Sequence, residues 1–154
     1  MMYLGVDPGL GGAIALLDSY GELVEVHDMP VVDKRVSQAL LSDLVMTMDI
    51  DIHDALTAVI EQVSAFPKQG VAGVFKFGVS YGIVLGVIAG YRINTVHVTS
   101  TKWKHDMRLS KDKEVSRRRA LDRWPRHAER FSLKKHEGRA EAALLALWHQ
   151  ERVT

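Results

Sequence analysis

The chain opens with Met1-Met2-Tyr3-Leu4-Gly5-Val6-Asp7-Pro8-Gly9-Leu10-Gly11-Gly12-Ala13-Ile14-Ala15-Leu16-Leu17. This pattern predicts a short apolar strand, a glycine-rich turn and a second apolar strand, because Pro8 cannot continue a hydrogen-bonded ladder. The turn glycines let the chain reverse and let backbone N–H groups approach a charged ligand. Asp7 therefore ends a strand beside bare backbone, a place suited to hold a cation and a phosphate. Because Asp-Pro-Gly is also a common turn sequence, a turn cap is the alternative role for Asp7.

Length and composition indicate one domain, residues 1–154, with enough apolar residues (47%) for a core. The absence of cysteine excludes disulfides and thiolate metal sites. The N-terminal sequence does not have the pattern of a targeting peptide, so we expect a cytoplasmic protein, bacterial or phage-encoded. Residues 100–139 carry 14 Lys and Arg against 6 Asp and Glu, a local charge of +8, whereas the remainder carries −7. This asymmetry predicts a polyanionic partner, with a solvated helix surface as the alternative.

The hydrophobic pattern predicts an α/β fold with a five-stranded mixed sheet flanked by helices. Beyond the first two strands, strands are expected at 23–28, 56–61 and 91–98, and helices at 36–48, 71–90, 111–123 and 137–150. A helix between two strands implies a crossover, which places strand 56–61 parallel to the first strand. We therefore expect Asp7 and Glu61 to end neighbouring strands at the same edge of the sheet.

The segment 71–90 is unusually apolar and carries Gly78, Gly82, Gly86 and Gly90 at intervals of four residues. On a helix these glycines form one stripe that another backbone can approach closely. Membrane helices also use small-residue stripes, but Lys76 shortens the apolar run below the ~20 residues that a span needs. We expect a buried helix packed on the sheet and no membrane partner. A contact between subunits is a second use for the glycine stripe.

Acidic side chains stand at positions that suit metal binding. Glu137 and Glu141 are four residues apart and share a helix face, where like charges repel unless a cation lies between them. Together with Asp7 and Glu61 they offer the hard oxygen ligands that Mg²⁺ or Mn²⁺ prefers, and two ions ~4 Å apart would clamp a phosphodiester. His136 is a further candidate ligand or proton carrier, with a surface histidine as the alternative. Acids in a first helical turn also stabilise the helix dipole, which is the alternative for the glutamates.

Several motifs in order along the chain carry a resemblance to a known family. They are Gly5-Val6-Asp7-Pro8-Gly9 with Gly12-Ala13-Ile14-Ala15; Ile60-Glu61-Gln62; Phe66-Pro67-Lys68-Gln69-Gly70; Phe75-Lys76-Phe77-Gly78 with Gly82; Trp103-Lys104; Lys111-Asp112-Lys113-Glu114; Trp124-Pro125; and Gly138-Arg139-Ala140-Glu141-Ala142. With this ordered set, which spans nearly the whole chain, the sequence resembles the RuvC-like Holliday junction resolvases. The resemblance is closest to their phage-type and organellar branch and implies an RNase H-like fold.

The resemblance implies a homodimeric endonuclease that resolves four-way DNA junctions by symmetric cuts. It implies two Mg²⁺ (or Mn²⁺) ions per active site and no small-molecule cofactor. Asp7, Glu61 and Glu141 match three of the family's metal-binding acids. The fourth ligand position, usually Asp or His in this branch, holds Glu137 here, and His136 is the alternative ligand. All four acids are expected to be catalytic.

The resemblance also assigns DNA contacts. The loop 66–70 and the start of the next helix are expected to enter the junction centre, where Phe66, Phe75 or Phe77 would stack on an unpaired base. Core packing is the alternative for Phe75 and Phe77. Phosphate contacts predict steep salt dependence of binding. The expected DNA-binding residues are Phe66, Lys68, Gln69, Lys76, Lys102, Lys104, Lys111, Lys113, Arg117 and Arg118.

Two other functions fit the same residues. The acids would equally serve an RNase H-like nuclease acting on RNA or an RNA–DNA hybrid. The unusual Glu137 also fits a module that binds junctions without cutting them. An actin-like sugar kinase or ATPase shares the Asp-x-Gly turn, but such enzymes need two domains of this kind and 154 residues supply one.

Overall fold

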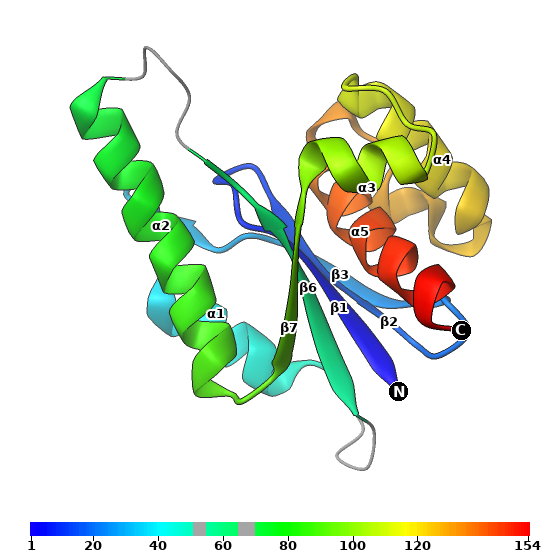
Figure 1. The fold of residues 1–154 in the computed structure, drawn as a ribbon, viewed down its shortest axis with the longest axis horizontal. Helices are drawn as coiled ribbons and strands as arrows, with labels where there is room; N and C mark the ends of the chain where they lie inside the picture. Colours follow the sequence, from blue (N-terminus) through cyan, green and yellow to red (C-terminus); the bar gives the residue numbers. More distant parts are fainter. Residues whose placement is uncertain (51–54, 65–69) are drawn as a thin grey trace.

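The computed structural model describes residues 1–50, 55–64 and 70–154, and has three layers with the sheet in the middle (Figure 1). Helices α1 (Gln38–Thr47) and α2 (Val71–Gly90) lie on one side of the sheet. Helices α3 (Ser100–Asp106), α4 (Lys113–Arg123) and α5 (Glu137–Val153) lie on the other. The sheet strands are β1 (Met2–Asp7), β2 (Ala13–Leu17), β3 (Leu23–Asp28), β6 (Leu56–Gln62) and β7 (Asn94–Thr99).

The sheet has the order β3-β2-β1-β6-β7. The first three strands form an antiparallel meander, whereas β6 pairs parallel to β1 and β7 parallel to β6. Val6 lies opposite Ile60 in the β1–β6 register. Asp7 and Glu61 are the next residues on these two strands, so both carboxylates reach the same edge of the sheet. The five-stranded mixed sheet and this placement confirm the sequence-based prediction.

Helix α5 packs against β1 at backbone distance. A Cβ atom at Gly5 would overlap the carbonyl oxygen of Ala142, and one at Gly138 would overlap the carbonyl oxygen of Gly11. Glycine is therefore required at both positions for the helix to approach the strand and the turn that follows it. This close approach carries Glu141, one turn into α5, to the edge of the sheet where β1 ends.

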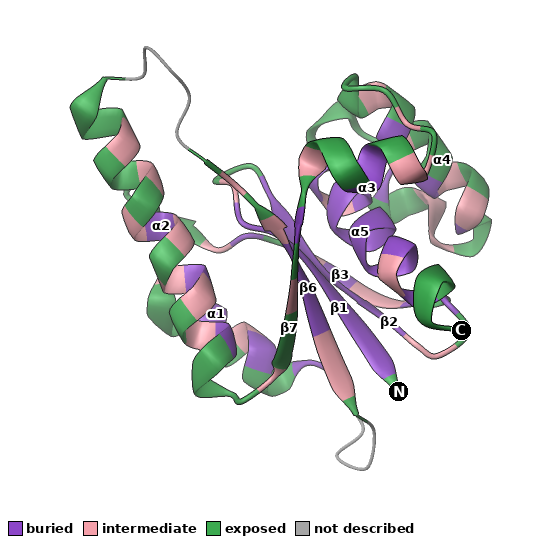
Figure 2. Cartoon of the chain, viewed as in Figure 1, coloured by how far each residue is buried: buried purple, intermediate pink, exposed green. Residues whose placement is uncertain are grey.

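Helix α2 differs from its prediction, although its bounds agree. Only Ser80, Val84 and Ile88 are buried, and most of the helix is exposed or half-buried (Figure 2). Within the described residues, α2 is the one helix long and apolar enough to cross a membrane by length and composition, and 17% of that window is buried. The expected buried helix is therefore wrong, because α2 packs on α1 and the short strand β5 (Arg35–Val36) along a narrow stripe.

Some short elements have no counterpart in the sequence prediction. Strand β4 (Val31–Val32) pairs with β5 in a small hairpin. Helix α3 follows β7 directly, with the Thr99 side chain accepting a hydrogen bond from the Lys102 N–H. Two 3₁₀ helices, η1 (Pro125–Arg130) and η2 (Lys134–His136), connect α4 to α5. Their polar sequences carry too few periodic apolar residues to signal a helix.

Candidate functional site

Three carboxylates from different elements gather at the edge of the sheet where β1 and β6 end. Asp7 is 8% exposed, and its Oδ1 accepts a hydrogen bond from the Gly9 N–H at 3.1 Å. Glu61 lies on the neighbouring strand and is half-buried. Glu141 comes from α5 and is 3% exposed. Carboxylates are almost never this buried unless they are paired or bind a cation.

The three acids are close enough to influence each other's ionisation. Burial, joined by the charge of Glu141, raises the pKa of Asp7, and the hydrogen bond from Gly9 opposes this shift. Burial also raises the pKa of Glu61, with further contributions from the charges of Asp7 and Glu141. The charge of Glu141 therefore makes Asp7 harder to ionise, and the charges of Asp7 and Glu141 do the same for Glu61, as expected where buried carboxylates lie near one another.

Two lysines supply positive charge to this cluster. The Lys104 Nζ lies 2.5 Å from Glu141 Oε1, and the Lys113 Nζ lies 3.4 Å from Glu141 Oε2. Lys104 is buried, at 8% exposure. Burial opposes ionisation of Lys113, yet the charges of Glu141 and Asp7 raise its pKa above the ordinary value. These two residues, expected to contact DNA phosphates, are held by the acid cluster in this conformation.

Trp103 was missed as a site residue, although Trp103-Lys104 was recognised as a motif. Its side chain is fully buried, and the indole N–H donates to Glu61 Oε2 at 2.8 Å. Nothing in the local sequence marks this contact, because residues 61 and 103 meet only through the β6–β7 pairing. A lone tryptophan between two lysines is the one signal, since a large apolar residue in a basic segment needs a buried location.

The two candidates for a fourth ligand lie in different surroundings. Glu137 is half-buried, and its charge contributes to the raised pKa of Lys113. His136 is buried, and its Nδ1 accepts from the Leu133 N–H at 3.3 Å. Burial lowers the pKa of His136, and the charged groups around it are Arg139, Asp28, Lys135 and Arg117. The charge of Glu137 thus acts on Lys113 at the acid cluster and also on Arg117, whereas the groups that act on His136 include the Arg139–Asp28 ion pair.

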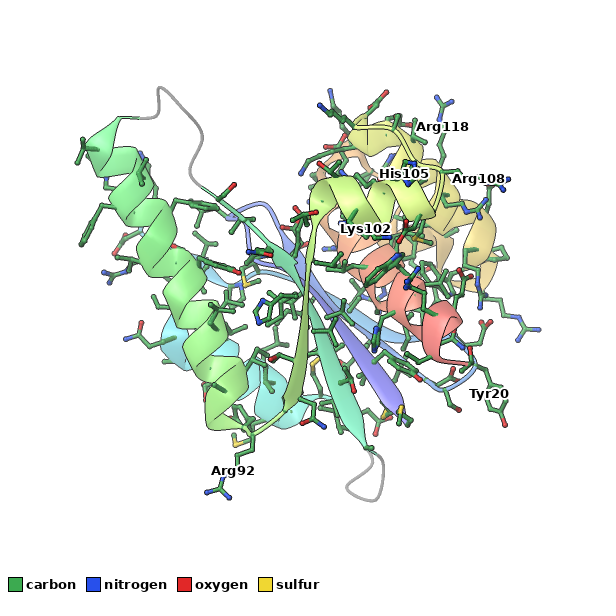
Figure 3. All side chains as sticks on the ribbon, viewed as in Figure 1. Tyr20, Arg92, Lys102, His105, Arg108 and Arg118 are labelled. Atoms are coloured by element: carbon green, nitrogen blue, oxygen red, sulfur yellow. The ribbon has the colours of Figure 1, made fainter. Side chains whose placement is uncertain are left out.

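The remaining basic residues divide into exposed and structural ones. Arg118 on α4 projects outward (Figure 3) and Lys102 on α3 is exposed; they are paired with Glu114 and Asp106 respectively. Arg117 is largely covered, and its guanidinium donates to Glu114 and to the Phe131 and Ser132 carbonyl oxygens. Its first role is therefore to tie α4 to the segment after η1.

Residues expected at the junction centre are only partly described. Lys76 and Lys111 are exposed, Phe75 is 71% exposed and Phe77 is half-buried. Core packing is therefore wrong for Phe75, whose ring faces solvent at the start of α2. Phe66, Lys68 and Gln69 lie outside the described residues.

The acids fit a divalent cation in chemistry, but their present contacts are with lysine and tryptophan. Within residues 1–50, 55–64 and 70–154, no three His, Asp or Glu side chains are arranged as a complete set of metal ligands. The carboxylate of Glu141 is directed at Lys104 and Lys113, which occupy its oxygens. Buried hard oxygen donors that require a positive counter-charge match the preference of Mg²⁺. Binding such an ion would require the ammonium groups to leave Glu141.

Known proteins match this chain in three-dimensional structure but not in sequence. No protein-family model matches the chain, and no curated protein matches its sequence. Among solved structures, Thermus thermophilus RuvC in complex with a Holliday junction substrate matches with a TM-score of 0.63 and 17% identity, covering 97% of this chain and 92% of that chain. Another Thermus thermophilus RuvC structure matches with a TM-score of 0.62 and 14% identity, covering 100% and 98%. The chain therefore has the RNase H-like fold of RuvC, which confirms the predicted fold class and the structural resemblance.

Proposed function

We propose that this protein is a structure-selective endonuclease that resolves four-way DNA junctions by symmetric, metal-dependent hydrolysis of phosphodiester bonds. The observation that carries the proposal is the meeting of Asp7, Glu61 and Glu141, from β1, β6 and α5, at one edge of the sheet. The fold shared with a RuvC bound to a Holliday junction substrate supports branched DNA as the substrate class. The net charge of +8 in residues 100–139 supports the same partner.

Asp7, Glu61 and Glu141 would hold Mg²⁺ or Mn²⁺, with Glu137 completing the set. Glu137 is preferred to His136 because its charge acts on Lys113 beside the cluster, whereas His136 is surrounded by Arg139 and Asp28. A bound ion in such a site supplies an activated water and neutralises charge on the phosphate.

The chain's own residues prepare this site for an anionic substrate. Lys104 and Lys113 put two ammonium groups beside the acids, so a phosphate that enters the site meets positive charge. The burial of Asp7 and Glu141 keeps water away and strengthens each electrostatic contact. Lys111, Lys102 and Arg118 are exposed near α3 and α4, and a DNA phosphate would compete with Asp106 for Lys102 and with Glu114 for Arg118.

A homodimer follows from the proposed reaction, because two symmetric cuts require two sites related by a two-fold axis. The exposed side of α2 is the surface that supports it. A Cβ added at Gly78, Gly82 or Gly86 would meet nothing within 4 Å. A groove of about 470 Å³ lies between α2 and the β5–α1 segment, lined by Val79, Ile83, Gly86 and Val87 on one side and by Arg35 and Gln38 on the other. A second copy would cover apolar surface that this chain leaves exposed.

One observation favours a second function, that of a module which binds junctions without cutting them. Lys104 and Lys113 already balance the charge of Glu141, and the acids are not arranged as a complete ligand set within the part of the chain that the structure describes. In such a protein the lysines would stay bound to Glu141 and the acid cluster would serve stability alone.

A substrate panel separates these functions. Purified protein is incubated with a labelled four-way junction, a linear duplex of the same sequence and an RNA–DNA hybrid, in Mg²⁺, Mn²⁺ or EDTA. The proposal predicts paired, symmetric cuts in the junction alone, dependent on metal and lost in Asp7→Asn. Tight junction binding without product in either metal would select the binding module. Preferential cutting of the hybrid would select the RNase H-like alternative.

A further inference from the structure

Helix α3 brings two consecutive side chains to two acids of the candidate site. Trp103 donates its indole N–H to Glu61 at 2.8 Å, and Lys104 contacts Glu141 at 2.5 Å. Both side chains are buried, Trp103 completely. Since Glu61 belongs to the sheet and Glu141 to α5, the seven residues of α3 join the two elements that carry these acids.

The helix is itself fixed at both ends. At its start the Thr99 hydroxyl accepts from the Lys102 N–H. At its end the Asp106 carboxylate accepts from the Trp148 indole N–H at 3.0 Å and from Arg152 at 3.3 Å, both on α5. The indole of Trp103 therefore projects from a helix that is anchored to α5, and it reaches Glu61 from a defined position.

The two contacts of α3 differ in chemistry. A lysine ammonium neutralises a carboxylate and competes with a metal ion for it. An indole N–H is a neutral, single donor, so it orients the Glu61 carboxylate, leaves its charge intact and engages one oxygen, Oε2. The other oxygen remains able to bind a cation. A flexible glutamate at a strand end needs such a partner, because an unsupported ligand samples several rotamers.

We propose that Trp103 is the positioning residue of Glu61, holding its carboxylate in the orientation that binds a divalent metal ion. This inference rests on the proposed function, because it requires that the acid cluster binds a metal. The role is separate from packing, since it depends on one N–H group and not on the size of the ring.

The test compares two tryptophan-to-phenylalanine variants of the full chain by isothermal titration calorimetry with Mn²⁺ in the absence of DNA. Trp103→Phe removes the donor to Glu61 and keeps an aromatic ring. Trp124→Phe is the matched control: Trp124 is 1% exposed and its indole N–H donates to the Gly21 carbonyl oxygen at 2.9 Å, at the β2–β3 turn. Both variants lose one buried indole N–H bond, so a general loss of stability affects both.

We expect Trp103→Phe to weaken Mn²⁺ binding by about 10- to 100-fold, the usual effect of removing a partner of a metal ligand. Trp124→Phe should bind Mn²⁺ as the wild type does. Wild-type affinity in folded Trp103→Phe, or an equal loss in Trp124→Phe, would overturn the inference and leave the proposed function standing. Failure of the wild type to bind Mn²⁺ would overturn the proposed function, and the inference with it.

A second variant decides the matter if Trp103→Phe does not fold. The double variant Trp148→Phe/Arg152→Ala removes both donors from α5 to Asp106 and loosens the attachment of α3 to α5 without touching Glu61. The inference predicts weaker Mn²⁺ binding in this variant, by a smaller factor than for Trp103→Phe. Wild-type affinity in the double variant, with Trp103→Phe unfolded, would overturn it.

Discussion

Helices α5 and α2 lie on opposite sides of the sheet and use glycine in opposite ways. At Gly138 of α5, and at Gly5 on the strand beneath, an added Cβ would overlap backbone atoms. The space beside each of these glycines is therefore already occupied by another segment of this chain. At Gly82 and Gly86 of α2 there is open space. Helix α2 is also the more apolar of the two, yet α5 is the buried one (Figure 2). The buried helix is therefore the one whose backbone approaches the sheet closely, and not the one with more apolar residues. Helix α2 keeps exposed apolar surface that another contact could cover.

The largest difference between the two sides of the sheet should appear in the free energy of unfolding when a glycine on each side is replaced by alanine. Gly5→Ala would force a methyl group into the backbone of α5, and we expect a loss of about 3 kcal/mol or more in the free energy of unfolding, at the upper end for overpacking. Gly82→Ala should instead stabilise the isolated chain by up to about 1 kcal/mol, because alanine favours the helix. Urea unfolding of both variants measures the contrast. Similar losses at the two positions would contradict it.

A charge on the open side of α2 should act on assembly and not on folding. Gly86 lines a groove between α2 and residues Arg35 and Gln38, and a Cβ added there meets nothing within 4 Å, so Gly86→Glu places a carboxylate in this groove without displacing the backbone. We expect a shift from dimer to monomer in sedimentation velocity, with little change in the thermal unfolding of the monomer. Gly86→Gln, which adds an uncharged side chain of the same length at the same position, serves as the control. A variant that sediments like the wild type would exclude this surface from the interface.

A smaller effect is expected from neutralising Asp7 in the metal-free protein. The pKa of Asp7 is raised above 3.8, chiefly by burial, so the folded state keeps a proton that the unfolded state releases. Between pH 3.8 and the raised pKa of the folded state, unfolding releases a proton from Asp7. The free energy of unfolding of the wild type therefore falls as pH rises through that interval. Asp7→Asn removes this dependence and should melt at a higher temperature than the wild type at pH 7, with the advantage vanishing below about pH 3.8. A lower melting temperature for Asp7→Asn at pH 7 would contradict the electrostatic account.

The sequence was sufficient for the sheet and for the two strand-end acids, because both follow from local patterns and from the geometry of parallel pairing. Asp7 and Glu61 each follow an apolar run, and a crossover places those runs side by side. The bounds of α2 were also predicted, since its apolar run is long and ends in glycine.

What the sequence did not yield depends on contacts between distant segments. The burial of α2 was overestimated because apolar content alone does not say which surface a neighbour covers. The roles of Trp103 and Lys104 were missed because their partners, Glu61 and Glu141, are separated from them by 42 and 37 residues. The DNA contact predicted for Lys104 stays a prediction, and the packing of α3 adds that its ammonium group pairs with the buried carboxylate of Glu141.

The most direct test of the central claim is a crystal structure of the wild-type protein grown with Mn²⁺, with anomalous diffraction recorded to locate the ion. The account predicts anomalous density bounded by the carboxylates of Asp7, Glu61 and Glu141, with the Lys104 ammonium moved away from Glu141. Crystals with Mn²⁺ elsewhere, or with Lys104 still bound to Glu141 and no ion at the acids, would contradict it.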